Sequence, residues 1–158
     1  MLGFFILTWR NQCQNAIAPL ILLAEDNDAN IQTFTTFLTV INYRVIVAKN
    51  GVEAVSMAKA NSPDIILMDI QMPIMDGFEA TQQIRLDPNL INTPIIALTA
   101  LAMEGDQERC LAAGMNRYMS KPFNLRQLAT QIAELLQITK LWTTPVSLSL
   151  MMKLLILM

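Results

Sequence analysis

The sequence predicts an α/β fold with a doubly wound five-stranded parallel sheet flanked by five helices. Between Leu20 and Gln137, five short apolar runs alternate with stretches whose apolar residues follow helical spacing. This alternation is typical of βα units built around a parallel sheet. The chain has 158 residues, which is enough for one domain with a buried core but too few for two domains that each have a core of this kind. Five βα units would stack into three layers.

The first half of the chain holds two predicted strands and two predicted helices. The strands are the apolar runs Leu20–Ala24 and Arg44–Ala48. Asn27 or Asp28 can cap the helix between them. The apolar positions of this helix follow helical spacing: Ile31, Phe34, Leu38 and Ile41. The second helix is predicted over Val52–Ala60 and ends before Asn61-Ser62-Pro63.

The second half holds three predicted strands and three predicted helices. Ile65–Met68 is an uninterrupted apolar run, as expected for a central strand buried on both faces. A helix over Gly77–Leu86 follows the loop Gln71–Asp76. The next strand, helix and strand are predicted at Ile95–Leu98, Glu104–Ala113 and Arg117–Met119. Asn124 can cap the last helix, whose apolar face consists of Leu125, Leu128, Ile132 and Leu135.

The net charge of −2 is distributed unevenly along the chain. All 13 acidic residues lie within residues 19–138, together with 8 of the 11 basic residues. This domain is acidic and has no cluster of Lys or Arg residues. Direct nucleic-acid binding is therefore not expected, because it requires basic side chains that neutralise the phosphates. The hydrophobic fraction of 53% indicates a chain that folds rather than a disordered one.

Histidine is absent and cysteine is rare, which excludes several kinds of site. Without histidine, the chain cannot carry a Ser-His-Asp triad, a histidine metal site or an autophosphorylating histidine. Any phosphoryl donor must therefore be another molecule or a detached segment. Cys13 and Cys110 lie far apart in the sequence, so we expect two unpaired thiols rather than a disulfide or a zinc site.

The two ends of the chain differ from its centre. Residues 1–18 are interpreted as an N-terminal extension or linker, 19–138 as the domain and 139–158 as an apolar C-terminal tail of unknown role. A signal peptide is the alternative at the N-terminus, but no basic residue precedes its apolar stretch. The tail could cover a sheet face, touch a membrane surface or pack with a partner. The apolar stretches Leu2–Leu7 and Val146–Met158 are too short to span a bilayer, so we expect no membrane span and a cytoplasmic protein.

Four of the five apolar runs lead into residues that can hold a phosphoryl group or a metal. These residues are Glu25 and Asp26, Asp69, Thr99 and Lys121, whereas the run Arg44–Ala48 finishes in Lys49-Asn50-Gly51. The carboxyl ends of parallel strands line one crevice, so residues far apart in sequence converge there. Three carboxylates, a hydroxyl and an amine in one crevice predict a Mg²⁺ and phosphoryl site.

Five short motifs carry this pattern: Ala24-Glu25-Asp26-Asn27, Leu67-Met68-Asp69-Ile70-Gln71-Met72-Pro73, Met75-Asp76-Gly77, Leu98-Thr99-Ala100 and Ser120-Lys121-Pro122-Phe123. Together they closely resemble the receiver domains of response regulators, the phospho-accepting modules of two-component signalling. The spacing is specific, because Asp69 lies 43 residues after Asp26, and Thr99 and Lys121 lie 30 and 52 residues after Asp69. The resemblance covers about residues 20–137 and implies a flavodoxin-like sheet with strand order 2-1-3-4-5.

The resemblance also implies a role for each site residue. Asp69 would accept the phosphoryl group, while Lys121 and Thr99 would bind its oxygens. The ligands of a Mg²⁺ ion, or of Mn²⁺ as a substitute, would be Glu25, Asp26, Asp69 and the main-chain carbonyl of Gln71. No organic cofactor is implied. The peptide bond before Pro122 is expected to be cis, which would turn Lys121 into the crevice.

Signalling would depend on a switch and on protein partners. By resemblance, Tyr118 rotates inward as Thr99 moves toward the phosphoryl group; the alternative is a half-buried strand tyrosine. The donor would be a histidine kinase or a histidine phosphotransfer protein. An output partner or a second copy would bind the face formed by Glu104–Ala113, the fifth strand and the last helix. Gln71 and Leu101 would flank an attacking water, and apolar Leu101 cannot orient it, so slow autodephosphorylation is expected.

Other interpretations of the same residues stay open at this point. Asp69 could be a helix cap, and the fold could serve as an interaction module that is never phosphorylated. A Mg²⁺-dependent phosphohydrolase is disfavoured, because Gln71 stands where such enzymes usually place a general acid. We therefore expect a signalling phospho-acceptor rather than an enzyme, either free-standing or part of a hybrid histidine kinase. Gly77 is interpreted as a turn glycine with positive φ.

Overall fold

The computed structural model describes residues 18–100 and 105–143, and the side chains up to residue 137. Its five strands are β1 (Leu20–Ala24), β2 (Arg44–Ala48), β3 (Ile65–Asp69), β4 (Ile95–Thr99) and β5 (Arg117–Ser120). They form one sheet in the order β2-β1-β3-β4-β5, and all neighbouring strands pair in parallel. The predicted fold class and strand order are confirmed.

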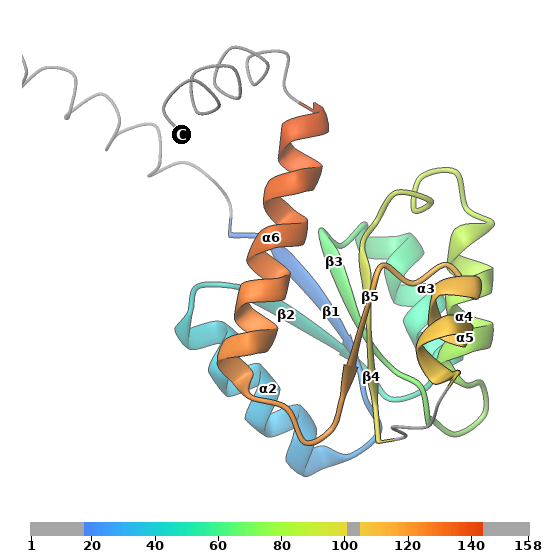
Figure 1. Ribbon diagram of the computed structural model, residues 1–158, viewed down its shortest axis with the longest axis horizontal. Helices are drawn as coiled ribbons and strands as arrows, with labels where there is room; N and C mark the ends of the chain where they lie inside the picture. The colour runs from blue at the N-terminus through green and yellow to red at the C-terminus, as the bar shows by residue number, and fades with distance from the viewer. Residues whose placement is uncertain (1–17, 101–104, 144–158) are drawn as a thin grey trace, which may run out of the picture.

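Five helices of the described residues cover the two faces of this sheet. They are α2 (Asp28–Val40), α3 (Gly51–Asn61), α4 (Gly77–Arg85), α5 (Asp106–Ala112) and α6 (Leu125–Thr143). Figure 1 shows α2 and α6 on one face and α3, α4 and α5 on the other. The sheet is therefore the middle of three layers, as the alternation of strands and helices predicts.

Two hydrophobic cores lie on either side of the central strand. All five residues of β3 are buried, and its side chains alternate between faces because the side-chain period of a strand is two residues. Ile65 and Leu67 join the core beneath α2 and α6, while Ile66 and Met68 join the core beneath α3, α4 and α5. Each such side chain contributes about 1.5–3 kcal/mol by burial, so β3 is a stable base for whatever follows it.

The helix caps agree with the predicted starts and place the loops. The Asn27 side chain accepts from the backbone N–H groups at the start of α2. Asn50 and Asp76 cap α3 and α4 through the N–H groups of Glu53 and Glu79. Asn124 accepts the N–H of Arg126 at 2.8 Å, so it caps α6 as predicted. Four short loops at the carboxyl edge of the sheet thus end in defined helix starts.

Some sequence-based expectations need correction or lie outside the described residues. Ile41 was expected on the buried face of its helix, but it follows the helix as the C-cap residue and is exposed. Helix α6 continues to Thr143, past the expected boundary at residue 138. The predictions for residues 1–17, for the tail after Thr143 and for Cys13 fall outside the described residues, whereas Cys110 is a buried free thiol as expected.

No helix in the described part of the chain is both long and apolar enough to cross a bilayer.

One guanidinium group joins three segments at the amino edge of the sheet. Arg85 Nε donates to the carbonyl of Gly114 at 2.8 Å, and one Nη donates to the carbonyls of Leu90 and Thr93 at 3.0 and 2.8 Å. Its other Nη donates to Asn116 Oδ1 at 3.0 Å. Since the bonds to the three carbonyl groups are partly buried, the loss of this one side chain would leave several acceptors unpaired.

We expect Arg85→Met to lower the free energy of unfolding by about 2–4 kcal/mol, because a charged donor to several carbonyl groups is lost. Urea unfolding followed by circular dichroism measures this change. The matched control is Arg126→Met on exposed α6, which should stay within about 0.5 kcal/mol of wild type. A cost below about 1 kcal/mol for Arg85→Met would contradict the expectation.

Candidate functional site

The predicted site residues come from four strand ends at one edge of the sheet. Glu25 and Asp26 follow β1, Asp69 and Thr99 are the last residues of β3 and β4, and Lys121 follows β5. The pairing of neighbouring strands places these ends within a residue of one another along the sheet. The convergence that the strand pattern predicts is therefore present in the structure.

One ammonium group joins two of the carboxylates. Lys121 Nζ donates to Asp69 Oδ2 at 2.6 Å and to Glu25 Oε2 at 2.8 Å. The Glu25 and Asp69 side chains are only 1% and 7% exposed, and that of Lys121 is 22% exposed. The Lys121–Pro122 peptide bond is cis, as expected, and Lys121 N–H donates to the Thr99 carbonyl at 2.6 Å. Lys121 is therefore held over the carboxylates by its backbone as well as by its charge.

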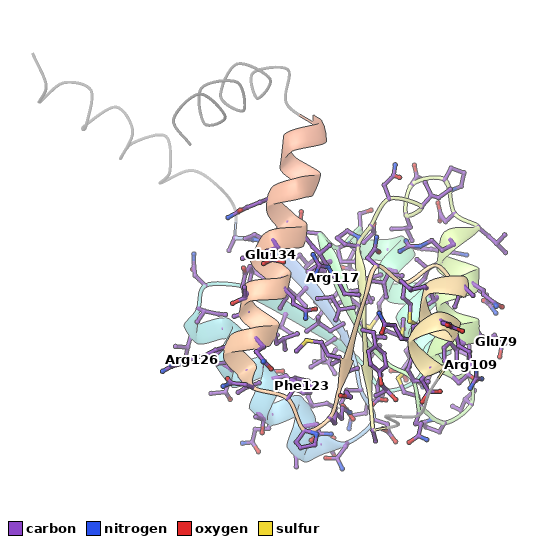
Figure 2. All side chains as sticks on the ribbon, viewed as in Figure 1. Glu79, Arg109, Arg117, Phe123, Arg126 and Glu134 are labelled. Atoms are coloured by element: carbon purple, nitrogen blue, oxygen red, sulfur yellow. The ribbon has the colours of Figure 1, made fainter. Side chains whose placement is uncertain are left out.

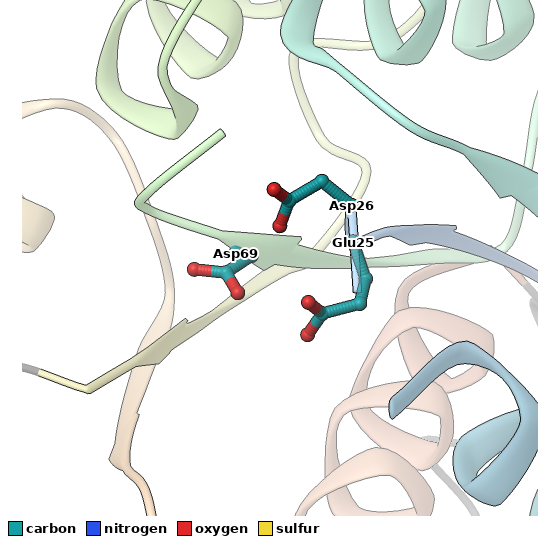
Figure 3. Close-up of side chains that lie close together, drawn as sticks. All are labelled: Glu25, Asp26 and Asp69. Carbon is teal, nitrogen blue, oxygen red and sulfur yellow. The ribbon is translucent and has the colours of Figure 1, made fainter. Parts of the chain in front are cut away.

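The third carboxylate completes an acidic group that could hold a metal ion. One oxygen from each of Glu25, Asp26 and Asp69 lies within 4.8 Å of the others, and Figure 3 shows these carboxylates turned toward a common space. Carboxylate oxygens are the donors that Mg²⁺ prefers. Asp26 is exposed, so the group is open to solvent on that side. The donor set and its spacing fit the Mg²⁺ site that the sequence predicts.

Burial and charge act against each other on the titrating groups. Burial raises the pKa of Asp69, and this effect outweighs the hydrogen bonds from Lys121 and from the Gln71 N–H, which lower it. Burial would lower the pKa of Lys121, but its hydrogen bonds to Asp69 and Glu25 raise it overall. Lys121 is therefore a permanent positive charge at neutral pH, and Asp69 is a more basic carboxylate than an exposed aspartate.

Asp69 is not the cap of a helix. Its Oδ1 accepts the N–H of Gln71 at 2.9 Å within the loop, and Asp76 is the residue that caps the following helix α4. The carboxylate thus remains directed at Lys121 rather than at a helix start. The Gln71 side chain is exposed, and Leu101, the other residue expected along the water path, lies outside the described residues.

The two expected switch residues lie in neighbouring strands. Thr99 is 2% exposed at the end of β4. Tyr118, on β5, is half-buried and packs against the core beneath α3, α4 and α5. Burial and the nearby carboxylate of Asp106 raise the pKa of Tyr118, so its hydroxyl stays protonated at neutral pH. This position between the sheet and α5 is compatible with either interpretation of the tyrosine.

The prediction for Gly77 is wrong, and the reason is packing. Gly77 is not among the glycines with positive φ; it is the first residue of α4 and is buried. A Cβ there would meet the carbonyl oxygen of Asp69 and would lie 3.0 Å from Ile70 Cα. Glycine is therefore required because the backbone leaving Asp69 crosses the start of α4. A sequence pattern shows a glycine but not which backbone passes over it.

Comparison with known proteins gives a consistent result. The family model described as "Response regulator receiver domain" matches residues 21–133. The polar-differentiation response regulator DivK of Brucella anthropi is 40% identical over 105 residues, which cover 66% of this chain and 85% of that protein.

Solved structures agree with the sequence match. The receiver domain of a sensor histidine kinase from Pseudomonas aeruginosa PAO1, with a magnesium ion coordinated in its active-site cleft, is 42% identical with a TM-score of 0.72. The match covers 76% of this chain and 98% of that one. The receiver domain of Ssk1, crystallised with the histidine phosphotransfer protein Ypd1 of Saccharomyces cerevisiae, belongs to a similar structure at 32% identity and a TM-score of 0.72, covering 77% and 91% of the two chains.

The carboxylate of Asp26 offers a test of the acidic group. We expect Asp26→Asn to raise the free energy of unfolding in metal-free buffer by about 0.5 kcal/mol, because it relieves repulsion with Glu25 and Asp69. We expect MgCl₂ to raise the thermal midpoint of wild type, and this rise should largely disappear in the variant. Differential scanning calorimetry with and without MgCl₂ measures both effects.

The matched control is Glu79→Gln, which removes an exposed carboxylate from α4 and should keep the full response to MgCl₂. Equal stabilisation of Asp26→Asn and wild type by MgCl₂ would show that Asp26 does not hold the ion.

Proposed function

Because the chain belongs to the response regulator receiver domain family of two-component signalling, we propose that Asp69 accepts a phosphoryl group from a phosphohistidine protein in a Mg²⁺-dependent reaction. The single observation that carries this proposal is the position of Lys121, whose ammonium group lies 2.6 Å from Asp69 and 2.8 Å from Glu25. A carboxylate at a strand end is common, but one paired with a lysine inside an acidic group suits phosphoryl chemistry.

The chemistry assigned to Asp69 is a direct displacement. One carboxylate oxygen of Asp69 attacks the phosphorus, an O–P bond forms, and the N–P bond of the phosphohistidine breaks with its electron pair passing to the imidazole nitrogen. The product is an acyl phosphate on Asp69. An anion must approach an anion in this step, so a fixed positive charge lowers the barrier, and Lys121 supplies it to the phosphoryl oxygens. Burial makes the charge more effective, because water screens it less.

The metal proposal rests on the donor set. Glu25, Asp26 and Asp69, with the main-chain carbonyl of Gln71, would hold a Mg²⁺ ion, and Mn²⁺ could replace it because both prefer oxygen ligands. When bound, the ion neutralises negative charge on the carboxylates and on the phosphoryl group. The magnesium ion in the cleft of the similar Pseudomonas receiver domain supports this assignment.

Signalling is proposed to pass from the site to one face of the domain. Thr99 would move toward the new phosphoryl group, and Tyr118 would turn inward into the space beside α5. The face of α5, β5 and α6 would then bind an output protein or a second copy. Arg117 on β5 and Glu134 on α6 form an ion pair across this face at 3.3 Å; both side chains are labelled in Figure 2. Direct nucleic-acid contact is not part of the proposal.

The donor is proposed to be a histidine kinase or a histidine phosphotransfer protein. The Ypd1–Ssk1 complex shows that a receiver of similar structure binds a phosphotransfer protein. We assign this role to residues 19–138 and propose a cytoplasmic location for the domain. A phosphohydrolase is the weaker candidate, because the position two residues after Asp69 is Gln71, an exposed amide that cannot transfer a proton.

Phosphorylation with a small donor tests the proposed reaction. After incubation with acetyl phosphate and MgCl₂, the intact mass of wild type should rise by roughly 80 Da, one phosphoryl group. Asp69→Asn keeps the shape of the side chain but lacks the nucleophile, so its mass should not change. Omission of MgCl₂ should also prevent the gain. A folded wild-type protein that gains no mass would favour an interaction module that is not phosphorylated.

The lifetime of the phosphoryl group is a separate prediction. We expect wild type to lose its phosphoryl group over minutes or longer after the donor is removed, since apolar Leu101 cannot orient an attacking water. Leu101→Asn should shorten this half-life several-fold, because an amide can hold the water by hydrogen bonding. Intact mass at timed intervals after desalting measures both rates. A wild-type half-life of seconds would contradict the expectation.

A further inference from the structure

The loop between β3 and α4 contains an unusual turn at Ile74. The φ angle of Ile74 is 72°, in the left-handed region that β-branched residues rarely adopt. The N–H of Met75 donates to the carbonyl of Pro73 at 2.8 Å, so the hydrogen bond spans only two residues. A positive φ at the central residue of such a bond is the rarer, strained kind of γ-turn. Glycine or asparagine would adopt this conformation at lower cost.

The loop is fixed on both sides of Ile74. The carbonyl of Met75 accepts the N–H of Gly51 at 3.0 Å, which ties it to the start of α3. The Gly77 N–H donates to the Ile70 carbonyl at 3.0 Å, and Asp76 caps α4. A Cβ at Gly51 would lie 2.5 Å from the Met75 carbonyl oxygen, so the two loops are already at closest approach. The turn cannot relax without loss of these bonds.

The Ile74 side chain contributes little burial free energy that could offset the strain in its backbone. It is 84% exposed, the highest value among the large hydrophobic residues that the structure describes as exposed. An exposed side chain recovers no free energy of burial. Local backbone cost without compensation inside the domain is a common sign of a residue kept for a contact with another molecule.

The position of Ile74 indicates which molecule its side chain would contact. Its loop leaves the sheet directly from Asp69, at the edge where the site lies. The Asp69 side chain is only 7% exposed, so a phosphohistidine reaches it only if the surface of its protein comes down onto the surrounding loops. Val52, 48% exposed, stands beside the same hydrogen-bonded pair of loops. An apolar, rigidly held contact therefore adjoins the path of the donor.

We propose that Ile74 is a donor-contact residue: its side chain is presented by the fixed turn to an apolar surface beside the phosphohistidine of the donor protein. This inference rests on the proposed function and adds to it a residue that selects protein donors over small ones. Burial of Ile74 in the complex supplies the free energy that the isolated domain does not recover. A small donor such as acetyl phosphate makes no use of it.

The test compares protein and small donors on the same variants. Ile74→Asn suits the positive φ and removes the apolar contact; we expect its thermal midpoint to equal or exceed that of wild type. Its phosphorylation by acetyl phosphate should stay within about twofold of wild type. Its phosphorylation by phospho-Ypd1 and a panel of bacterial phosphohistidine proteins should be about tenfold slower, as expected for the loss of one buried aliphatic contact. Ile74→Val, which keeps the contact, should restore transfer to within about twofold.

The matched control is Leu86→Asn, at the opposite end of α4. Leu86 is 83% exposed, so this variant removes an equally exposed apolar side chain far from the carboxyl edge, and it should accept phosphoryl groups from every donor as wild type does. Equal loss of both donor reactions in Ile74→Asn would overturn the inference, because Ile74 would then shape the site itself. Unchanged transfer from protein donors would overturn it too.

The proposed function fails separately from this inference. If wild type gains no phosphoryl group from acetyl phosphate, the proposed function is wrong. If wild type accepts from acetyl phosphate but from no phosphohistidine protein of the panel, Asp69 is a phospho-acceptor, and the protein donor together with its contact at Ile74 is refuted.

Discussion

The ammonium group of Lys121 lies 2.6 and 2.8 Å from two carboxylates that are almost fully buried, those of Asp69 and Glu25. Removal of such groups from water costs several kcal/mol each unless charged partners replace the lost hydration. One cation cannot neutralise two carboxylates, and Asp26 adds a third nearby. The excess negative charge favours a further cation and repels a phosphoryl anion that arrives without one. The rest of the structure serves to hold this unfavourable arrangement in place.

The sheet holds the charged groups in place because each strand that carries a site residue at or just after its end has buried residues ahead of it. On β3, Ile66, Leu67 and Met68 are fully buried, and the charged residue comes only after them. On the neighbouring strands, the Lys121 N–H donates to the Thr99 carbonyl at 2.6 Å, which couples the end of β4 to the loop that carries the lysine. Burial along the strands can offset the cost at their ends, because the same rigid elements carry both.

The sequence predicted those features that depend on local pattern or on strand order. The apolar run before Asp69 marks a buried strand whatever surrounds it, and parallel pairing then brings Glu25 and Lys121 to the same edge. Gly77 was misread because its requirement comes from the Asp69 carbonyl that crosses it, a tertiary contact. Ile41 fits helical spacing but lies past the end of α2. The φ angle of Ile74 could not be predicted either, since Pro-Ile-Met carries no glycine or asparagine to mark a left-handed residue.

The two edges of the sheet differ in how well buried charges and backbone conformations are compensated by their surroundings. At the amino edge, the guanidinium of Arg85 donates to four hydrogen-bond acceptors in two loops, so its burial is compensated. At the carboxyl edge lie a buried carboxylate pair with one cation and a β-branched residue at positive φ. Selection for stability alone would remove such costs at either edge equally. Two other non-glycine residues of the described chain adopt a positive φ, Asn42 and Ser62, but both follow helix ends and neither is β-branched. Among the described residues, a β-branched residue in this conformation occurs only in the loop that follows Asp69, as expected when a chain keeps unfavourable residues for chemistry and for contact with a partner.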